Sequence, residues 1–378
     1  MSNLWETRNA AARPAVSTPV TVGGDGTEVS GNAVNLKSLS LQLGLSQTTV
    51  SRALNGFPEV SERTRRRVQE AAQAANYRPS AIASSLAAGR TRVIGHVIPM
   101  AQHRMINPHF SDFLAGASEA YAAAGYDMLL RAVPLDEEED VYRDLARQHR
   151  VDAVVVHGPK LDEPRIDLLT QLDLPFVVHG RCGNAEQKRY CFLDVDNIGA
   201  LQTATRHLTE LGHDRIALVN GLENMRFAAD RRKGFVNAMK EAGADIRPQY
   251  MRAADMTEPF GYAATSDLLA LDEAPTAIVY GSMLMAMGGM RAAAQAGMKV
   301  PNDLSMVTYD DALSFLEDED QGHNDRFLTV VRSSIQEAGE KLATMLMEKI
   351  EHPDRLLQQV LQPEFLEGAS TAAPKARP

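Results

Sequence analysis

The stretch "LSQTTVSRALNG", residues 45–56, carries hydroxyl side chains, one glutamine and a single cation, Arg52. Ser46 can cap a short helix, because its side-chain oxygen can accept a hydrogen bond from an unpaired amide of the first turn. Val50 and Leu54 are four residues apart, so both face the same side of that helix, and the "NG" pair then breaks it. The opposite face is polar but hardly charged, which raises the question of what it contacts.

Two further helices flank this stretch. In "VNLKSLSLQLG", residues 34–44, leucines recur at helical spacing and Gly44 ends the pattern. After the stretch, Ser61 can cap a third helix that reaches nearly to Asn76. Two helices joined by a glycine turn, with the small Ser40 where they approach closely, predict a helix-turn-helix.

The outward face of the middle helix suits DNA reading. Amide and hydroxyl side chains can read base edges in the major groove, and Arg52 can donate two hydrogen bonds to a guanine. An ordinary solvated face is the alternative, but the basic third helix favours DNA because its first turn can grip phosphates. The contacts predicted here are Gln47, Thr48, Ser51, Arg52, Asn55, Ser61, Thr64 and Arg65.

The charge of the chain is unevenly distributed. Its 378 residues carry a net charge of −10, which by itself argues against a nucleic-acid partner. Residues 34–92, however, hold nine cations against three anions, whereas the residues after Arg92 sum to −15. Such asymmetry indicates a polyanion-binding head joined to an acidic trunk with a different task.

The composition predicts a cytoplasmic protein of two or three domains, with 44% hydrophobic residues to form their cores. Its two cysteines, Cys182 and Cys191, suit a reducing compartment and give neither a disulfide framework nor metal-ligand spacing. No apolar run approaches the roughly 20 residues of a membrane span, and the first residues do not resemble an export signal. Residues 1–33 are rich in Gly, Ser, Thr, Ala and Pro, so we expect a disordered extension there.

From Arg92 onward, short apolar runs alternate with amphipathic stretches. "VDAVVVH" (151–157) and "RIALVNG" (215–221) are typical of buried strands, and "NIGALQTATRHLTELG" (197–212) is typical of a helix. Further strands are expected in "RVIGHVI", "YDMLLRA", "PFVVHG", "TAIVY" and "LSMVTYD". This alternation predicts an α/β fold with mostly parallel sheets, in which ligands bind at the carboxyl ends of the strands.

Three blocks in the first part of the chain carry a family resemblance. "TVSRALNG", "VSERTRRRV" and "NYRPSAIASSLAAGRT" resemble, in order and spacing, the head of the lactose/galactose-repressor (LacI/GalR) family. The resemblance implies a DNA-binding head over 34–79 and a hinge helix with linker over 80–91. In that family the hinge helices of a dimer pair in the minor groove, where Leu86 matches the wedge leucine and Ala83 the small residue at the groove surface. A plain linker helix is the alternative.

The rest of the chain resembles the two-lobed trunk of the same family, which is similar to periplasmic sugar-binding proteins. The matching blocks are "DNIGALQTATRHLTELGHDRIALVNG", "ADRRKGF" and "VPNDLSMVTYDD". The resemblance implies an effector-binding and dimerisation domain over residues 92–378. We expect its first lobe at about 92–193 and 325–355, and its second lobe at about 194–324 and 356–370.

The resemblance also implies a sugar site in the cleft between the lobes. Arg231 matches the arginine that forks onto neighbouring sugar hydroxyls, and Asp310 matches the carboxylate that accepts hydrogen bonds from them. Phe227 and Met256 can line an apolar face of a sugar ring.

Several loops depart from the family pattern, and these departures bear on which sugar fits. Ser282 begins the pair that replaces the usual Asn-Asp, Gly180 stands where an aspartate often follows the fourth strand, and His157 stands where an asparagine can occur. The wording of "PFVVHGR" and "FAADRRKGF" resembles α-glucoside-type regulators. The effector site predicted in this way comprises Gln102, Phe110, His157, Arg181, Phe227, Arg231, Met256, Ser282 and Asp310.

The function expected from these patterns is a sugar-responsive repressor of carbohydrate-utilisation genes. It would bind a near-palindromic operator as a homodimer and use no cofactor and no metal. We expect no enzyme, since the chain has no G-x-S-x-G elbow, metal-spaced histidine pair or phosphate-binding loop. The alternative is a sugar-binding or sugar-modifying protein without a regulatory role, which leaves the DNA-reading head without a purpose.

Overall fold

The computed structural model describes residues 35–77, 90–100, 108–134, 136–183, 189–309 and 327–375. The chain divides into two compact units, Met1–Ser80 and Ala81–Pro378. Each unit has hydrophobic cores of its own. The expected fold class, a helical head and an α/β trunk with mostly parallel sheets, is confirmed.

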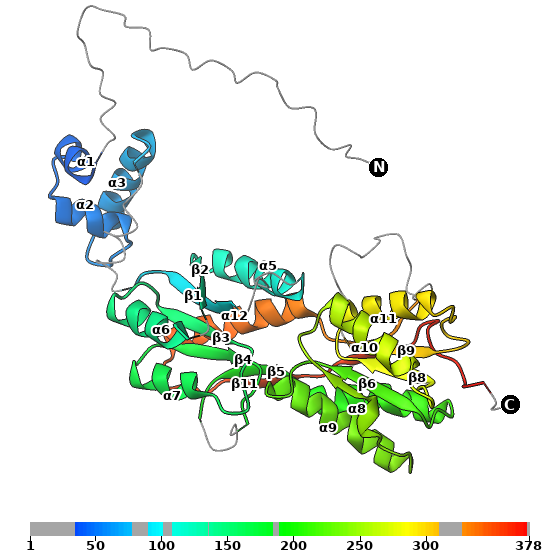
Figure 1. Cartoon of the computed structure of the whole chain (residues 1–378). Helices are drawn as coiled ribbons and strands as arrows, with labels where there is room; N and C mark the ends of the chain where they lie inside the picture. The colour runs from blue at the N-terminus through cyan, green and yellow to red at the C-terminus, as the bar shows by residue number, and fades with distance from the viewer. Residues whose placement is uncertain are drawn as a thin grey trace, which may run out of the picture. The chain divides into compact units, whose positions relative to one another are not determined.

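The first unit contains a head of three helices (Figure 1), which are α1 Leu36–Leu43, α2 Gln47–Leu54 and α3 Glu62–Ala74. One apolar side chain from each helix is fully buried at their meeting point: Leu39, Val50 and Val68. These side chains lie on the faces that the leucine and valine spacing predicted, so the polar faces are left to solvent.

The ends of the head helices follow their local chemistry. Ser46 and Ser61 cap α2 and α3, as predicted, because their hydroxyls accept from the amides of Thr49 and Thr64. Gly44 ends α1 with a φ of 65°, a left-handed conformation that glycine adopts without a Cβ clash. The helix-turn-helix geometry is thus encoded in neighbouring residues.

The second unit contains two six-stranded sheets, one in each lobe. The first sheet has the order β11-β5-β4-β3-β1-β2 and all its pairs are parallel. The second has the order β12-β10-β9-β8-β6-β7 and is parallel except for the pairing of β12 with β10. The strands are β1 Val93–Met100, β2 Asp127–Pro134, β3 Ala153–His157, β4 Phe176–His179, β5 Phe192–Val195, β6 Ile216–Asn220, β7 Met251–Ala253, β8 Ala277–Tyr280, β9 Ser305–Tyr309, β10 Thr329–Arg332, β11 Gln358–Leu361 and β12 Glu364–Leu366.

Helices cover both faces of each sheet (Figure 1). On the first sheet α5 and α12 pack on one face and α6 and α7 on the other. On the second sheet α10 and α11 pack on one face and α8 and α9 on the other. The helices of this unit are α5 Pro108–Ala123, α6 Glu138–Arg147, α7 Pro164–Gln171, α8 Asn197–Glu210, α9 Arg226–Glu241, α10 Glu258–Leu269, α11 Met283–Gln295 and α12 Ile335–Glu351, with a short 3₁₀ turn at Pro248–Tyr250.

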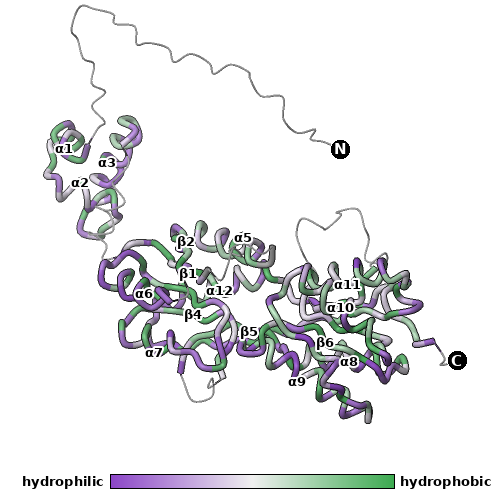
Figure 2. The backbone as a smooth tube through the Cα atoms, viewed as in Figure 1, coloured by the Kyte–Doolittle hydropathy of each residue, from purple (hydrophilic) through white to green (hydrophobic). Residues whose placement is uncertain are grey.

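Burial on both faces explains the apolar runs of the strands. Every residue of β6, β8 and β9 is buried, and Figure 2 shows the strands inside both lobes as hydrophobic segments. Strands of a parallel sheet that is covered on both faces read as continuous apolar runs in this way. Among the described residues, no helix combines the length and the apolar character that crossing a membrane requires.

The chain passes between the lobes after β5, after β10 and after β11. The lobe limits expected from the sequence are therefore wrong for two segments. β10 belongs to the second lobe because its backbone pairs with β9, and β11 belongs to the first lobe because it pairs with β5. The limit expected at about residue 193 lies within two residues of Val195, where β5 ends in the first sheet.

Candidate functional site

The outward face of α2 is polar and accessible. Gln47, Thr48 and Arg52 are exposed and Ser51 is half-buried, while Val50 on the opposite side is fully buried. The structure thus brings the four predicted base-reading side chains together on one side of a single helix. Their chemistry, an amide, two hydroxyls and a guanidinium, matches the donors and acceptors that read base edges.

Other predicted contacts of the head also hold local structure. The Nδ2 of Asn55 donates to the carbonyl oxygen of Ser51 at 2.9 Å, so this side chain helps to close the end of α2. The hydroxyls of Ser61 and Thr64 lie 2.9 Å apart at the start of α3. Ser61 and Thr64 lie at the N-terminus of α3, where backbone and side-chain donors also suit phosphate oxygens.

The arginines of α3 have different environments. The Nη2 of Arg65 donates to the carbonyl oxygen of Phe57 at 2.9 Å, and the Nη2 of Arg67 donates to that of Leu43 at 2.7 Å. Arg65 therefore ties down the loop between α2 and α3, in addition to the phosphate contact predicted for it. Arg66 is exposed and pairs with Glu70 on the same helix.

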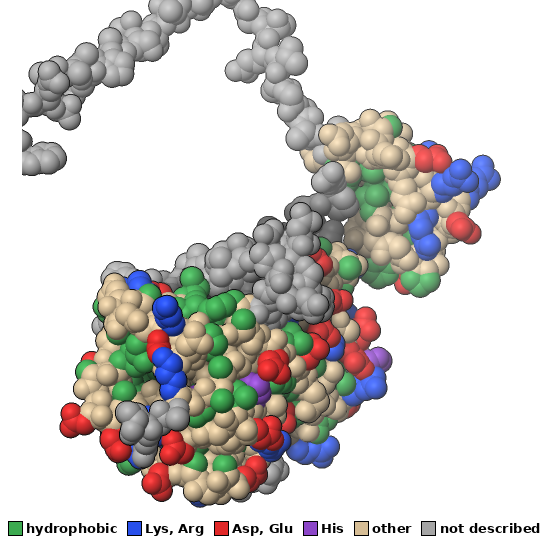
Figure 3. Space-filling view, turned by 90° about the vertical axis from the view of Figure 1, so that its right-hand side faces the viewer, with side chains coloured by type: hydrophobic (Ala, Val, Ile, Leu, Met, Phe, Trp, Pro, Cys, Tyr) green, Lys and Arg blue, Asp and Glu red, His purple; other side chains and the backbone are tan. Residues whose placement is uncertain are grey.

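The charge asymmetry of the sequence is visible on the folded units. Figure 3 shows cationic side chains gathered on the smaller unit and acidic side chains spread over the visible face of the larger one. A cationic surface attracts the phosphate backbone of DNA, and releasing the counterions of DNA makes the affinity salt-dependent.

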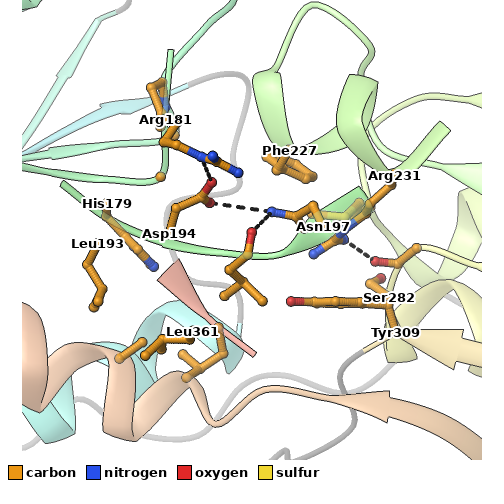
Figure 4. A pocket seen from close by; sticks show the side chains of 18 residues that line it. His179, Arg181, Leu193, Asp194, Asn197, Phe227, Arg231, Ser282, Tyr309 and Leu361 are labelled. Atoms are coloured by element: carbon orange, nitrogen blue, oxygen red, sulfur yellow. Dashed lines mark hydrogen bonds and ion pairs between the residues drawn. The ribbon is translucent and has the colours of Figure 1, made fainter. Parts of the chain in front are cut away.

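A pocket lies between the lobes of the second unit (Figure 4). It encloses about 930 Å³ of space not filled by atoms, its open mouth included. Residues at or just after the carboxyl ends of strands from both sheets surround it, as expected for parallel α/β sheets. The lining residues are Gly158, Pro159, His179, Gly180, Arg181, Leu193, Asp194, Val195, Asn197, Phe227, Arg231, Met256, Gly281, Ser282, Tyr309, Ile335, Ala338 and Leu361.

Arg231 dominates the second-lobe wall of the pocket. Its Nε donates to the Oδ1 of Asn197 at 2.9 Å, and its Nη1 donates to the carbonyl oxygen of Gly281 at 2.6 Å. The guanidinium carbon lies 3.5 Å from the ring centre of Tyr309 and 5.0 Å from that of Phe227. These contacts fix the plane and direction of a charged donor group, which is the preorganisation that a binding site needs.

An ion pair crosses the first-lobe wall. The Nε of Arg181 donates to the Oδ2 of Asp194 at 2.5 Å, and the Nδ2 of Asn197 reaches the other carboxylate oxygen at 3.4 Å. Burial raises the pKa of the Asp194 carboxyl, and the charge of Arg181 opposes that rise. Arg181, Asp194, Asn197 and Arg231 therefore form one polar chain from the first-lobe wall to the second.

Two predicted effector residues lie behind the first-lobe wall rather than in it. His157 at the end of β3 does not line the pocket, and its place in the wall is taken by His179 of the neighbouring strand β4. The ring of Phe110 meets the ring of His157 edge-on at 5.2 Å. His157 therefore does not contact a ligand in the pocket directly, because its side chain lies behind the residues that line the wall.

The predicted site is only partly recovered. Of the residues predicted from sequence, Arg181, Phe227, Arg231, Met256 and Ser282 line the pocket. Four predicted contacts lie outside the described residues: Ala83, Leu86, Gln102 and Asp310. Sequence reasoning missed His179, Asp194, Asn197 and Tyr309, although each stands at or within two residues of the end of a strand, which is the signal that could have found them.

Loops from the two lobes meet at the edge of the pocket. Lys160 and Met225 form an isolated antiparallel bridge, and the amide of Leu161 donates to the carbonyl oxygen of Asn224 at 3.1 Å. The first-lobe loop 158–163 is therefore joined to the second-lobe segment 222–226 by backbone contacts. We call this pair of segments the interlobe latch.

Arg226 strengthens the interlobe latch with its side chain. Its Nη1 donates to the carbonyl oxygens of Cys182 at 3.1 Å and Gly183 at 3.3 Å, both in the first lobe. Its Nε pairs with Asp230, one turn later on α9, at 2.7 Å. The ion pair holds the guanidinium in the direction that reaches across the cleft.

The chemistry of the pocket suits non-covalent binding. It combines a fixed guanidinium, a buried carboxylate and aromatic faces, which together can hold a polyhydroxylated ring. Among the described residues, no three His, Cys, Asp or Glu side chains lie close enough together to hold a metal ion.

Two family models match most of the chain. The model described as "Periplasmic binding proteins and sugar binding domain of LacI family" matches residues 91–366, and "Bacterial regulatory proteins, lacI family" matches residues 36–80. A known relative is the HTH-type transcriptional regulator AglR of Rhizobium meliloti (strain 1021). It is 40% identical over 350 residues, which are 91% of this chain and 96% of that protein.

Solved structures of similar proteins share the fold. The transcriptional regulator CelR in complex with cellobiose has a TM-score of 0.66 at 26% identity, covering 89% of this chain and 99% of that one. The lac repressor dimer, bound to operator and the anti-inducer ONPF, has a TM-score of 0.76. At 24% identity over 90% of this chain and 100% of that one, it supports the fold alone.

Proposed function

This chain belongs to the LacI family of bacterial regulatory proteins and is a DNA-binding transcriptional regulator with a sugar-binding domain, and we propose that its effector is an α-glucoside bound in the interlobe pocket. Operator affinity changes when this sugar binds, and the regulated genes serve carbohydrate utilisation. The protein acts as a repressor in the cytoplasm.

The polar chain across the pocket is the observation that carries the sugar assignment. Sugar hydroxyls donate and accept hydrogen bonds, so their site needs both a fixed donor fork and a charged acceptor. Arg231 supplies the fork and the buried Asp194 carboxylate supplies an acceptor on the facing wall. Asp310, the acceptor expected from the family resemblance, is proposed as a second one.

The apolar surfaces of the pocket fit the faces of a sugar ring. Phe227 and Tyr309 flank the guanidinium, and Met256 and Leu361 add aliphatic surface. The resemblance of the motifs "PFVVHGR" and "FAADRRKGF" to α-glucoside-type regulators supports an α-linked sugar. The cellobiose complex of CelR supports a sugar of two rings.

The head is proposed to read an operator half-site through α2. Gln47, Thr48, Ser51 and Arg52 contact bases, while Ser61, Thr64 and Arg65 contact phosphates. A homodimer presents two such heads, so that a near-palindromic operator matches its two-fold symmetry, as in the operator complex of the lac repressor dimer. Leu86 and Ala83 are proposed contacts in the minor groove.

The interlobe latch links the sugar to the DNA. Gly158 and Pro159 of the latch also line the pocket, and Phe227 of the pocket directly follows the latch on α9. A ligand between the walls therefore changes how stable the joined arrangement of the lobes is. A change in that arrangement alters the geometry with which two heads are offered to DNA. The coupling is reciprocal, so operator DNA changes sugar affinity by the same factor as sugar changes operator affinity.

The direct test measures operator binding in the presence of sugars. Operator fragments are first selected from genomic DNA by the purified full-length protein, and their affinity is then measured by fluorescence anisotropy. Maltose and trehalose, which are α-glucosides, should change the affinity at least fivefold, while β-linked cellobiose should change it less. An operator affinity that no α-glucoside alters would refute the effector assignment and leave the DNA-binding function standing.

A further inference from the structure

Three histidines, one of them fully buried and two half-buried, lie side by side behind and within the first-lobe wall of the pocket. They are His96 on β1, His157 on β3 and His179 on β4, which are neighbouring strands of the first sheet. His157 and His179 are register partners, and His96 is fully buried. Only His179 lines the pocket.

A hydrogen-bonded line runs from the core toward this wall. The Nε2 of His96 lies 3.2 Å from the hydroxyl of Tyr121, and its Nδ1 lies 2.9 Å from the Nε2 of His157. A neutral imidazole has one donor and one acceptor nitrogen, so the tautomer of one ring sets that of the next. The line therefore fixes both the direction and the protonation pattern of His157.

All three rings are kept uncharged. Burial lowers the pKa of His96 to about 3 and that of His179 to about 4. The pKa of His157 lies well below its usual value because of burial first and the neighbouring His96, His179 and Arg165 next. A neutral imidazole in the pocket can both donate and accept, unlike the charged groups nearby.

Stacked rings hold His179 in place. Its ring stacks on Phe113 at 4.4 Å with an angle of 20°, and the ring of His157 meets it edge-on at 5.8 Å. His157 also meets Phe113 edge-on at 5.2 Å. The ring of His179 therefore has little freedom to turn, and Figure 4 shows it extending toward the cavity with a ring nitrogen at its tip.

Within the part of the chain that the structure describes, the ring nitrogens of His179 remain available to a ligand. Among the described residues, neither ring nitrogen of His179 forms a hydrogen bond, although the side chain is half-buried in the pocket wall. An apolar side chain would stack on Phe113 without the cost of removing an imidazole from water. A bound hydroxyl group at the tip of the ring would offset that cost.

We propose that His179 contacts the effector and recognises one of its hydroxyl groups, and that His157, His96 and Tyr121 position its ring. This inference rests on the proposed function of the pocket as a sugar site. It makes His179 a specificity-determining residue, because a site built to pair with a hydroxyl discriminates strongly against an analogue that lacks it.

A cycle of deoxy sugars and variants tests this contact. Calorimetry on the full-length protein compares the α-glucoside that binds with its monodeoxy analogues. In the natural protein one deoxy position should weaken binding about tenfold, the value of a hydrogen bond worth about 1.4 kcal/mol. In the His179→Phe variant the same position should cost nothing further, while every other deoxy position costs what it did before.

Controls separate this proposal from the function on which it rests. His207→Phe changes another partly buried imidazole, one that lies beside Phe365 and away from the pocket, and should leave all the affinities unchanged. Operator binding and thermal unfolding verify that each variant is folded, and His179→Asn replaces His179→Phe if the latter is not. Equal losses at every deoxy position in both proteins would overturn the His179 contact alone, whereas a natural protein that binds no α-glucoside would overturn both proposals.

The positioning role has its own test. His96→Phe removes both hydrogen bonds of the line and should reduce the discrimination between the parent sugar and the critical deoxy analogue several-fold. His96→Gln, which retains a donor and an acceptor, should restore part of it. If His96→Phe weakens both sugars by the same factor and leaves their ratio unchanged, His96 only supports the fold and does not position His179.

Discussion

The proposed DNA-reading face and the proposed effector pocket are built in opposite ways. The four base-reading candidates of the head lie within six consecutive residues of one helix, and three of them are exposed. The pocket draws its side chains from the ends of strands in two sheets, and Arg231 and Asp194 are both buried and bonded to neighbours. A surface helix can therefore change one contact at a time, whereas a change in the pocket disturbs a network.

The largest effect that we expect comes from acid, and it should fall on the pocket side only. The imidazoles of His96, His157 and His179 have depressed pKa values in the folded state, and the head contains no histidine. Below about pH 6.5 these imidazoles are protonated in the unfolded chain but stay neutral in the folded lobe. Stability is therefore complete above that pH and is lost toward pH 4, by up to about 1.4 kcal/mol per pH unit for each imidazole.

Denaturant unfolding followed by circular dichroism at several pH values measures this dependence. Its slope against pH gives the difference in bound protons between the two states. The His96→Phe variant should lower the slope by about one proton. A slope that is the same in both proteins would mean that His96 is not held neutral by the fold.

Next in size is the loss of the guanidinium from the pocket. Arg231→Ala should weaken binding of the α-glucoside by roughly 2–5 kcal/mol, because it removes a charged donor and leaves Asn197 and the Gly281 carbonyl without their partner. Operator affinity should stay near that of the natural protein. Calorimetry and anisotropy measure the two affinities separately.

The neighbouring Arg232 provides the control. It is exposed, and among the described residues its side chain pairs with Glu223 alone, so Arg232→Ala should alter neither affinity. If Arg231→Ala lowers operator affinity and sugar affinity equally, the pocket is not the site that binds the sugar. The contrast between the pocket and the head would then be wrong.

A smaller effect is expected from the head. Arg52→Ala should cost about 1–3 kcal/mol of operator affinity and relax the base preference at one position of each half-site. Sugar affinity in the absence of DNA should be unchanged. Selection of randomised operators, with Arg66→Ala as an exposed cation on α3 for comparison, distinguishes the two kinds of contact, because Arg66→Ala should weaken all sequences alike.

The smallest expected effect belongs to the interlobe latch. Arg226→Ala removes two hydrogen bonds to first-lobe carbonyls and should lower sugar affinity by about 1 kcal/mol, roughly fivefold. Because the latch acts between the lobes, the factor by which sugar changes operator affinity should fall as well. An unaltered coupling factor would show that Arg226 does not contribute to the coupling between sugar binding and operator binding.

Much of the fold could be predicted from the sequence, because the sequence signals for helix ends and buried strands are local. Ser46, Ser61 and Gly44 mark the helix ends of the head at the positions where the structure has them. The seven expected strands are present. Among them β6, β8 and β9 are buried throughout, and strands buried on both faces need continuous apolar residues. Five short strands were not predicted, β5, β7, β10, β11 and β12, because three or four residues are too few to show a clear period.

The residues of the site could be predicted from the sequence only where a family pattern or a strand end marked them. Phe227, Arg231 and Met256 stand on loops and helix starts that the resemblance singled out, and all three line the pocket. His157 was placed in the wall, but the register of β3 and β4 puts His179 there instead. Nothing in one strand reveals which of two neighbouring side chains faces the cleft.

The sequence by itself determined the helices, the main strands, the basic head and the acidic trunk, because these depend on spacing, capping and charge within short segments. The tertiary structure alone decided that β10 lies in one lobe and β11 in the other, and that Arg181, Asp194, Asn197 and Arg231 join into one chain. The physical reason is that sheet pairing and burial act between residues that are far apart in the chain. Backbone pairing across the sheets decides which side chains meet, and burial then fixes their pKa values and hydrogen bonds.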